Sequence, residues 1–216
     1  MKKLGLFIVF AFAIVVAVPG AYAQITEKNI KKEAKKAAKR ISKEGWTLYD
    51  PSDDLRSVLI NHYQNLQNEG AQELVGVASS FVMEKFGKQM ATHSACIEYA
   101  RQSTSLLISR APIEWSQNAP EAGVLDKFYS AYESHLSSEI KRALTPSFSI
   151  IRSVNKNEMG PKVFDMQSFF IVNENDALKA RLAAMNKAID ESGLSQEYAS
   201  KLAEFVQGDF DVESHE

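Results

Sequence analysis

The chain has 216 residues, a formal net charge of −2 and an apolar share of 45%, which is that of an ordinary globular protein. This length suits one domain with additional helices, because domains cluster near about 100 to 150 residues. The small net charge gives no general attraction for nucleic acid, so we expect no nucleic-acid partner. The single cysteine, Cys96, has no disulfide partner within the chain, so stability must come from packing.

The first 23 residues have the three-part layout of a secretory signal peptide. Lys2 and Lys3 precede an apolar run from Leu4 to Val18, and the small-x-small sequence Ala21-Tyr22-Ala23 ends the segment. We predict cleavage after Ala23 and export to the periplasm or outer membrane, or secretion. An uncleaved membrane anchor is the alternative, but it needs about 20 apolar residues. No cysteine follows the cleavage site, so we expect that the protein is not a lipoprotein.

Residues 24–45 form a basic leader segment, with a predicted helix from Thr26 to Glu44 that Gly45 ends. Its apolar stripe is thin, so we expect weak docking; the stripe consists of Ile30, Ala34, Ala37 and Ile41. Clustered lysines and arginines bind anionic lipid headgroups at about 1 kcal/mol each. The alternative is a solvated helix whose charges serve solubility. The surface-contact candidates in this helix are Lys31, Lys32, Lys35, Lys36, Lys39 and Arg40.

The rest of the chain predicts one α+β domain over residues 46–207, followed by a flexible acidic tail at 208–216. The predicted elements are helices at Asp54–Gln67, Lys88–Arg110 and Val124–Leu144, strands at Glu73–Val82, Ser147–Asn155 and Lys162–Val172, and helices that begin after Asn173 and Ser195. We expect a small sheet of about three strands with an antiparallel hairpin. The long helix and the helix after Asn173 should pack on one face, with the other helices around them.

Side-chain size predicts how the first long strand packs. Val75, Val77 and Phe81 fall on one side of it, while the other side carries small residues that include Gly76 and Ala78. The small side should therefore lie close beneath a helix. The long helix, which follows a turn at Phe86-Gly87, should turn its apolar face to the sheet. That face is predicted to contain Met90, Ile97, Ala100, Leu107 and Ile108.

Aromatic residues gather in the later half of the chain. Trp115 lies in an irregular, proline-containing linker, Ala111–Gly123, and we take it as a further surface-contact candidate. The other aromatic residues are Phe128, Tyr129, Tyr132, Phe148, Phe164, Phe169 and Phe170. They are typical of a core, and the alternative is an apolar groove for a lipid or small ligand.

Reactive side chains form no recognisable set. Cys96 and His93 lie three residues apart on one predicted helix, yet a helix interior offers no oxyanion hole, and free cysteine usually packs as a small apolar residue. His135 and Glu139 have a spacing that suits a metal, but two ligands do not complete a metal shell. We therefore expect no catalytic residue, no metal and no cofactor.

Weak motifs support a resemblance that covers roughly residues 31–191. They are the segment Leu74–Ser80, the alanines Ala91, Ala95 and Ala100, the strand Lys162–Val172 and the leader Lys31–Trp46. Their order behind a secretion signal resembles a family of small envelope domains that includes certain outer-membrane lipoproteins and the N-terminal domain of a flagellar ring protein. The resemblance implies an α+β envelope domain without known catalytic residues, although this chain has no cysteine for lipidation.

These observations predict a non-enzymatic, exported protein of a bacterial envelope that binds a protein, an anionic polymer or a membrane surface. Two alternatives stay open: a lipid or small-ligand carrier that uses the aromatic half, and an enzyme with an unrecognised Cys/His site. The sequence leaves the oligomeric state open.

Overall fold

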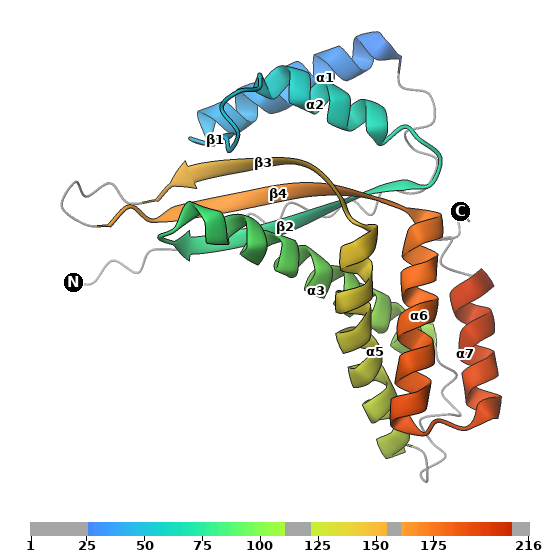
Figure 1. Ribbon diagram of the computed structural model, residues 1–216. Helices are drawn as coiled ribbons and strands as arrows, with labels where there is room; N and C mark the ends of the chain where they lie inside the picture. Colours follow the sequence, from blue (N-terminus) through green and yellow to red (C-terminus); the bar gives the residue numbers. More distant parts are fainter. Residues whose placement is uncertain (1–25, 111–121, 155–160, 209–216) are drawn as a thin grey trace, which may run out of the picture.

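A computed structural model describes residues 26–110, 122–154 and 161–208 (Figure 1). Several predicted features lie outside the described residues. These are the signal peptide at 1–23, the linker residues 111–121 with Trp115, the hairpin residues 155–160 and the tail residues 209–216.

The described residues form the expected α+β fold, with an antiparallel sheet and helices on both of its faces (Figure 1). The elements in chain order are α1 (Glu27–Lys43), β1 (Thr47–Leu48), α2 (Leu55–Asn65), β2 (Ala71–Phe81), α3 (Glu84–Arg110), α5 (Ala122–Ala143), β3 (Thr145–Ser153), β4 (Phe164–Asn173), α6 (Glu174–Ser192) and α7 (Gln196–Gly208).

The sheet has four strands in the order β1-β3-β4-β2, and all neighbours are antiparallel. Strand β4 lies between β3 and β2 and is one of the two interior strands. The sequence predicts about three strands because β1 is too short to show an alternating pattern. Thr47 and Leu48 pair with Ile151 and Ile150 at the edge of β3.

Helices α1 and α2 cover one face of the sheet, where they share a core with β3 and β4 (Figure 1). The main buried residues of this core are Ala34, Ala37, Ile41, Trp46, Leu59, Phe148, Ile150 and Phe169. All four residues of the apolar stripe of α1 are buried. The expectation of weak docking is therefore wrong: small alanines let α1 approach α2 closely, and Trp46 extends their contact area.

Helix α3 crosses the opposite face, close beneath β2 and β4 (Figure 1). A β-carbon added at Gly76 of β2 would lie 1.8 Å from the carbonyl oxygen of Ala91 in α3. Ala78 and Ala91 are almost completely buried in the same contact. The prediction that the small side of this strand lies against a helix is confirmed.

The predicted start of the long helix is wrong, and its predicted apolar face is right only in part: Ala100 and Leu107 are buried. Helix α3 begins at Glu84, so Gly87 lies inside the helix and not in a turn before it. A larger residue at position 87 would collide with the ring of Phe81. Met90 and Ile108 are 46% and 52% exposed. The buried residues of α3 outside the predicted face are Ala91, Ala95, Cys96, Tyr99, Ser103 and Thr104. The close approach to the sheet selects small side chains.

Phe81 also lies on the face opposite to the predicted one. The pairing of β2 with β4 shifts between Ala78 and Phe81, where Ser80 has a φ of 57°. A bulge adds one residue to the strand and therefore reverses the alternation beyond it. Phe81 thus packs with Ala91 and Met166 on the face that α3 covers, while Val75 packs on the face of α1 and α2.

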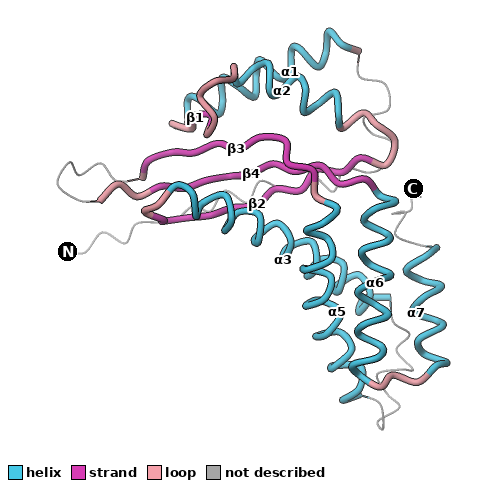
Figure 2. Tube along the Cα trace, viewed as in Figure 1, coloured by secondary structure: helices cyan, strands magenta, loops and turns pink. Residues whose placement is uncertain are grey.

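The C-terminal half of α3 forms a helical bundle with α5, α6 and α7 that extends beyond the sheet (Figure 2). Leu125, Phe128, Tyr132, Leu136 and Ile140 are all buried along α5, as the sequence predicts. No helix within the described ranges is both long enough and apolar enough to cross a membrane.

Candidate functional site

The exposed surface of α1 is the most strongly charged surface in the described part of the chain. Its buried stripe lies on one side of the helix, and at about 100° per residue the opposite side carries Lys28, Lys32, Lys35, Lys39 and Lys43. We call these five residues the lysine row. Lys43 lies 15 residues after Lys28, so the row is about 22 Å long at the rise of an α-helix.

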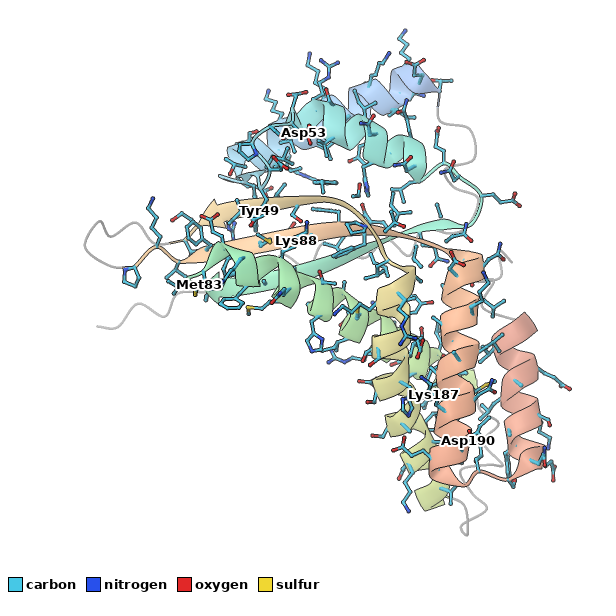
Figure 3. All side chains as sticks on the ribbon, viewed as in Figure 1. Tyr49, Asp53, Met83, Lys88, Lys187 and Asp190 are labelled. Atoms are coloured by element: carbon cyan, nitrogen blue, oxygen red, sulfur yellow. The ribbon has the colours of Figure 1, made fainter. Side chains whose placement is uncertain are left out.

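No ion pair neutralises the lysine row within the described residues. Lys31 and Lys36, on the flanks, pair with Glu27 and Glu33 at 2.5 Å and 2.8 Å. The other predicted contact residues of this helix, Lys32, Lys35, Lys39 and Arg40, are exposed. The side chains of α1 extend outward from the molecule in Figure 3.

The charge of the chain is divided unevenly. Residues 27–43 contain eight basic and two acidic side chains, a net charge of +6, whereas residues 44–216 contain 15 basic and 25 acidic side chains, a net charge of −10. All exposed residues of α1 are polar or charged, so this surface offers electrostatic contact without an apolar residue to insert. With Lys2 and Lys3, which add the remaining two positive charges, the overall charge is −2 and conceals this division.

The structure does not bring Cys96 and His93 together. Cys96 is 1% exposed, and burial raises the pKa of its thiol, with the charge of Lys141 acting in the opposite direction. His93 is exposed on the surface of α3. A buried, protonated thiol is a poor nucleophile.

His135 and Glu139 engage different partners. His135 Nε2 lies 2.8 Å from Oε2 of Glu191, and Glu139 accepts hydrogen bonds from Arg142 and Lys187 at 2.6 Å each. The hydrogen bond from Lys187 is the main cause of the lowered pKa of Glu139. Across the described ranges, no group of three or more His, Cys, Asp or Glu side chains is placed to hold a metal ion.

The aromatic residues of the later half are divided among three cores. Phe128 and Tyr132 lie in the helical bundle, Phe148 and Phe169 beneath α1 and α2, and Phe164 beside α3. Tyr129 lines an open groove of about 570 Å³ between α3 and α5, together with Ile97 and Ile108.

The sequence reasoning places His62 at the edge of an apolar stripe, but this histidine is 1% exposed. Its Nδ1 lies 2.8 Å from Ser147 Oγ, and its Nε2 lies 2.5 Å from Glu73 Oε2. The ring of Phe148 meets the imidazole edge to face at 5.2 Å. Serine, histidine and carboxylate form a continuous hydrogen-bonded chain, whose histidine is closed off by α2 and the sheet.

A second buried polar cluster joins α3, α6 and β2. Arg181, 2% exposed, donates hydrogen bonds to Tyr99 at 2.6 Å and to Glu174, and Gln72 donates to the other oxygen of Glu174 at 2.7 Å. The sequence contains one signal for this cluster. Arg181 lies four residues after Ala177 and therefore on the buried face of α6.

We compared the chain with protein-family models, with curated proteins and with solved structures, and no match was found. The resemblance to small envelope domains stays a prediction.

Proposed function

We propose that this protein is an exported bacterial envelope protein that acts without catalysis, by docking the lysine row of α1 onto an anionic membrane surface. The observation that carries the proposal is the row itself: five exposed lysines that pair with no acidic side chain in the described part of the chain, on a helix that the core holds in place. An anionic envelope polymer or an acidic protein would use the same charges, and the experiment below separates these partners.

Rigid docking of α1 supports binding rather than mere solubility. Ile30, Ala34, Ala37 and Ile41 fix the rotation of the helix, so the lysines face outward together. A fixed array loses less conformational entropy on binding than a frayed helix. Each lysine near an anionic lipid surface contributes about 1 kcal/mol, and the row is long enough for several lysines to reach that surface at once.

The uneven distribution of charge supports membrane binding in one orientation. A body of net charge −10 is repelled by an anionic surface, whereas the α1 region of net charge +6 is attracted to it. The protein should therefore bind with α1 toward the surface and the helical bundle away from it. This orientation needs no apolar insertion, so binding should weaken steeply with salt.

Vesicle co-sedimentation tests the proposal. Residues 24–216 should bind vesicles that contain phosphatidylglycerol and not vesicles of phosphatidylcholine alone. The triple variant K32Q/K35Q/K39Q should bind about 100-fold more weakly, because three lysines contribute about 3 kcal/mol. The matched control K127Q/K141Q/K162Q removes the same charge from exposed positions elsewhere and should bind like the wild type.

Equal binding by the two triple variants would overturn the proposal. Binding to an anionic polymer but not to vesicles would replace the membrane by that polymer as the partner. Capture of an acidic envelope protein in the absence of lipid would do the same for a protein.

A further inference from the structure

Strand β2 is a long edge of the sheet that no strand within the described ranges pairs with on its outer side. It has 11 residues and pairs only with β4 among the described residues. In an antiparallel strand, every second residue directs its N–H and C=O groups away from its neighbour, so β2 presents a row of free hydrogen-bonding groups. It contains no proline and no lysine, Glu73 is its single charged residue, and its bulge lies beyond Ala78, so residues 71–78 remain regular.

Exposed apolar side chains gather at the same edge. Of the eight large apolar side chains that are exposed in the described residues, seven lie between residues 77 and 108. Val77, Val82, Met83, Phe86 and Met90 lie near this edge, whereas Leu106 and Ile108 lie in the part of α3 that extends beyond the sheet; the exposures are between 38% and 55%. An apolar cluster at the surface marks an interaction site more often than single exposed residues do.

An apolar stripe formed by Met83, which directly precedes α3, and by Phe86 and Met90 of α3 lies on the side of the helix toward this edge; we call it the apolar stripe of α3. Lys88 lies on the other side of the helix, near Asp50. Hydrogen bonds from Ser52 are the main cause of the lowered pKa of Asp50, and the nearby ammonium of Lys88 lowers this pKa further. Asp50 follows β1, at the far edge of the sheet. The stripe lies about 150° around the helix from Lys88, at 100° per residue, and therefore on the β2 side.

Val77 adds an exposed apolar group on the other face of the same strand. It shares the face of Val75, which packs toward α1 and α2, yet Val77 is 46% exposed. Apolar surface thus flanks the open strand on both faces of the sheet, as an interface that continues the sheet requires.

We infer that β2 and the apolar stripe of α3 form the interface of a homodimer, in which two β2 strands pair antiparallel and create a continuous eight-stranded sheet. A segment that pairs with an edge strand must itself be a strand. Strand β2 is the long edge strand of the described sheet, so a second copy of β2 can pair with it. A two-fold axis makes such an interface self-complementary. With the axis near Gly76, Val75 faces Val77 of the partner subunit, and Glu73 faces an uncharged serine.

The local charge agrees with a second copy as the occupant. Residues 71–110 contain four basic and three acidic side chains, so two such surfaces do not repel each other. The lysine row and the acidic remainder of the chain would repel their own copies. The β2 edge is therefore nearly neutral, in a molecule whose helix α1 is basic and whose remaining residues are acidic overall.

The dimer would strengthen the proposed membrane contact. The two-fold axis of an antiparallel pair is perpendicular to the sheet, so both α1–α2 layers lie on the same face and both lysine rows point the same way. Two rows on one surface bind with avidity. This consequence rests on the proposed function, whereas the dimer does not.

Sedimentation equilibrium of residues 24–216 tests the dimer. The wild type should show twice the mass of one chain. V77K and M90D each place a charge at the interface and should weaken dimerisation at least about tenfold, which corresponds to 1.4 kcal/mol. V154K is the matched control, because Val154 is also 46% exposed but lies at the end of β3. Circular dichroism establishes that each variant is folded.

A wild type that stays monomeric at its highest soluble concentration would overturn the inference. A dimer that V77K and M90D leave intact, or that V154K weakens equally, would also overturn it. Vesicle binding is read separately: V77K should bind anionic vesicles at least about tenfold more weakly than V154K, which has the same charge. Loss of vesicle binding in all proteins would remove the proposed function and leave the dimer standing.

Discussion

The imidazole Nε2 of His62 lies 2.5 Å from Oε2 of Glu73, which joins helix α2 to strand β2 on the face of the sheet beneath α1 and α2. Ser147 of β3 lies 2.8 Å from the other ring nitrogen, so one side chain links three elements. Glu73 remains 36% exposed, whereas His62 is buried. This contact positions α2, and α2 in turn supports α1 and its lysine row.

Replacing His62 by alanine should lower the free energy of unfolding by about 2 to 4 kcal/mol, because it leaves a cavity and removes two buried hydrogen bonds. Urea unfolding measures the loss. His135→Ala is the control: His135 is about one-third exposed and pairs with an exposed glutamate, so its loss should stay below about 1 kcal/mol. Similar losses in the two variants would contradict a structural role for His62.

Replacing Gly76 by alanine should destabilise the protein by about 3 kcal/mol or more, because the new β-carbon would collide with the backbone of Ala91. Thermal unfolding measures the effect. Gly123→Ala offers a matched substitution, since nothing lies within 4 Å of a β-carbon there. At that position in α5, alanine should stabilise by up to about 1 kcal/mol. A tolerated alanine at Gly76 would show that α3 does not approach β2 this closely.

The bulge residue Ser80 should prefer glycine. Its φ of 57° lies in the left-handed region, so Ser80→Gly should raise the free energy of unfolding by about 1 kcal/mol, and Ser80→Val should lower it. Both variants keep the backbone N–H that donates to Asp165 at 3.1 Å. Urea unfolding of the pair measures the difference. Equal stability of the glycine and valine variants would contradict the bulge.

Two buried tyrosines should respond in opposite directions to replacement by phenylalanine. Tyr99 accepts a hydrogen bond from Arg181, so Tyr99→Phe should destabilise by about 1 to 3 kcal/mol. The hydroxyl of Tyr132 is buried and has no hydrogen-bond partner within the described residues. Tyr132→Phe should therefore leave stability unchanged or raise it by about 1 kcal/mol. A larger loss for Tyr132→Phe than for Tyr99→Phe would reverse this assignment.

The same tyrosines predict a loss of stability at alkaline pH. Burial is the main cause that raises the pKa of both Tyr99 and Tyr132 in the folded protein. Unfolded tyrosine titrates near about 10, so above this pH the folded state holds more protons than the unfolded state. The stabilising contribution is complete below pH 10 and should fall as the pH rises beyond it. Tyr132→Phe should reduce this slope, which urea unfolding between pH 8 and pH 11 measures.

The sequence predicts elements well where their pattern is local. The apolar line of α5, the stop of α6 at Gly193 and the cap of α6 at Asn173 depend on residues within a few turns of each other. The small side of β2 was likewise readable, because Gly76 and Ala78 alternate with larger residues. Local spacing also predicts the basic face of α1 and most of its exposed lysines.

Contacts between residues far apart in the sequence explain where the sequence-based predictions are wrong. Met90 fits an apolar helical face, but the contact at Gly76 gives the sheet side of α3 to Ala91 and Ala95 and leaves Met90 exposed. The face of Phe81 depends on a bulge that appears only when β2 pairs with β4. The hydrogen-bond partners of His62 lie 11 and 85 residues away in the sequence. The periodicity of a helix or strand carries no information about contacts at such separations.

By itself, the sequence determined the fold class, the order of the main elements and the charge of α1, because these follow from composition and from spacing along one helix or strand. Only the tertiary structure decided which face each element buries, that the apolar stripe of α1 is buried, and that β2 is an edge strand of the described sheet beside exposed apolar residues. The physical reason is that the burial of a side chain depends on which segments pack together. Steric fit between residues far apart in the sequence determines that packing.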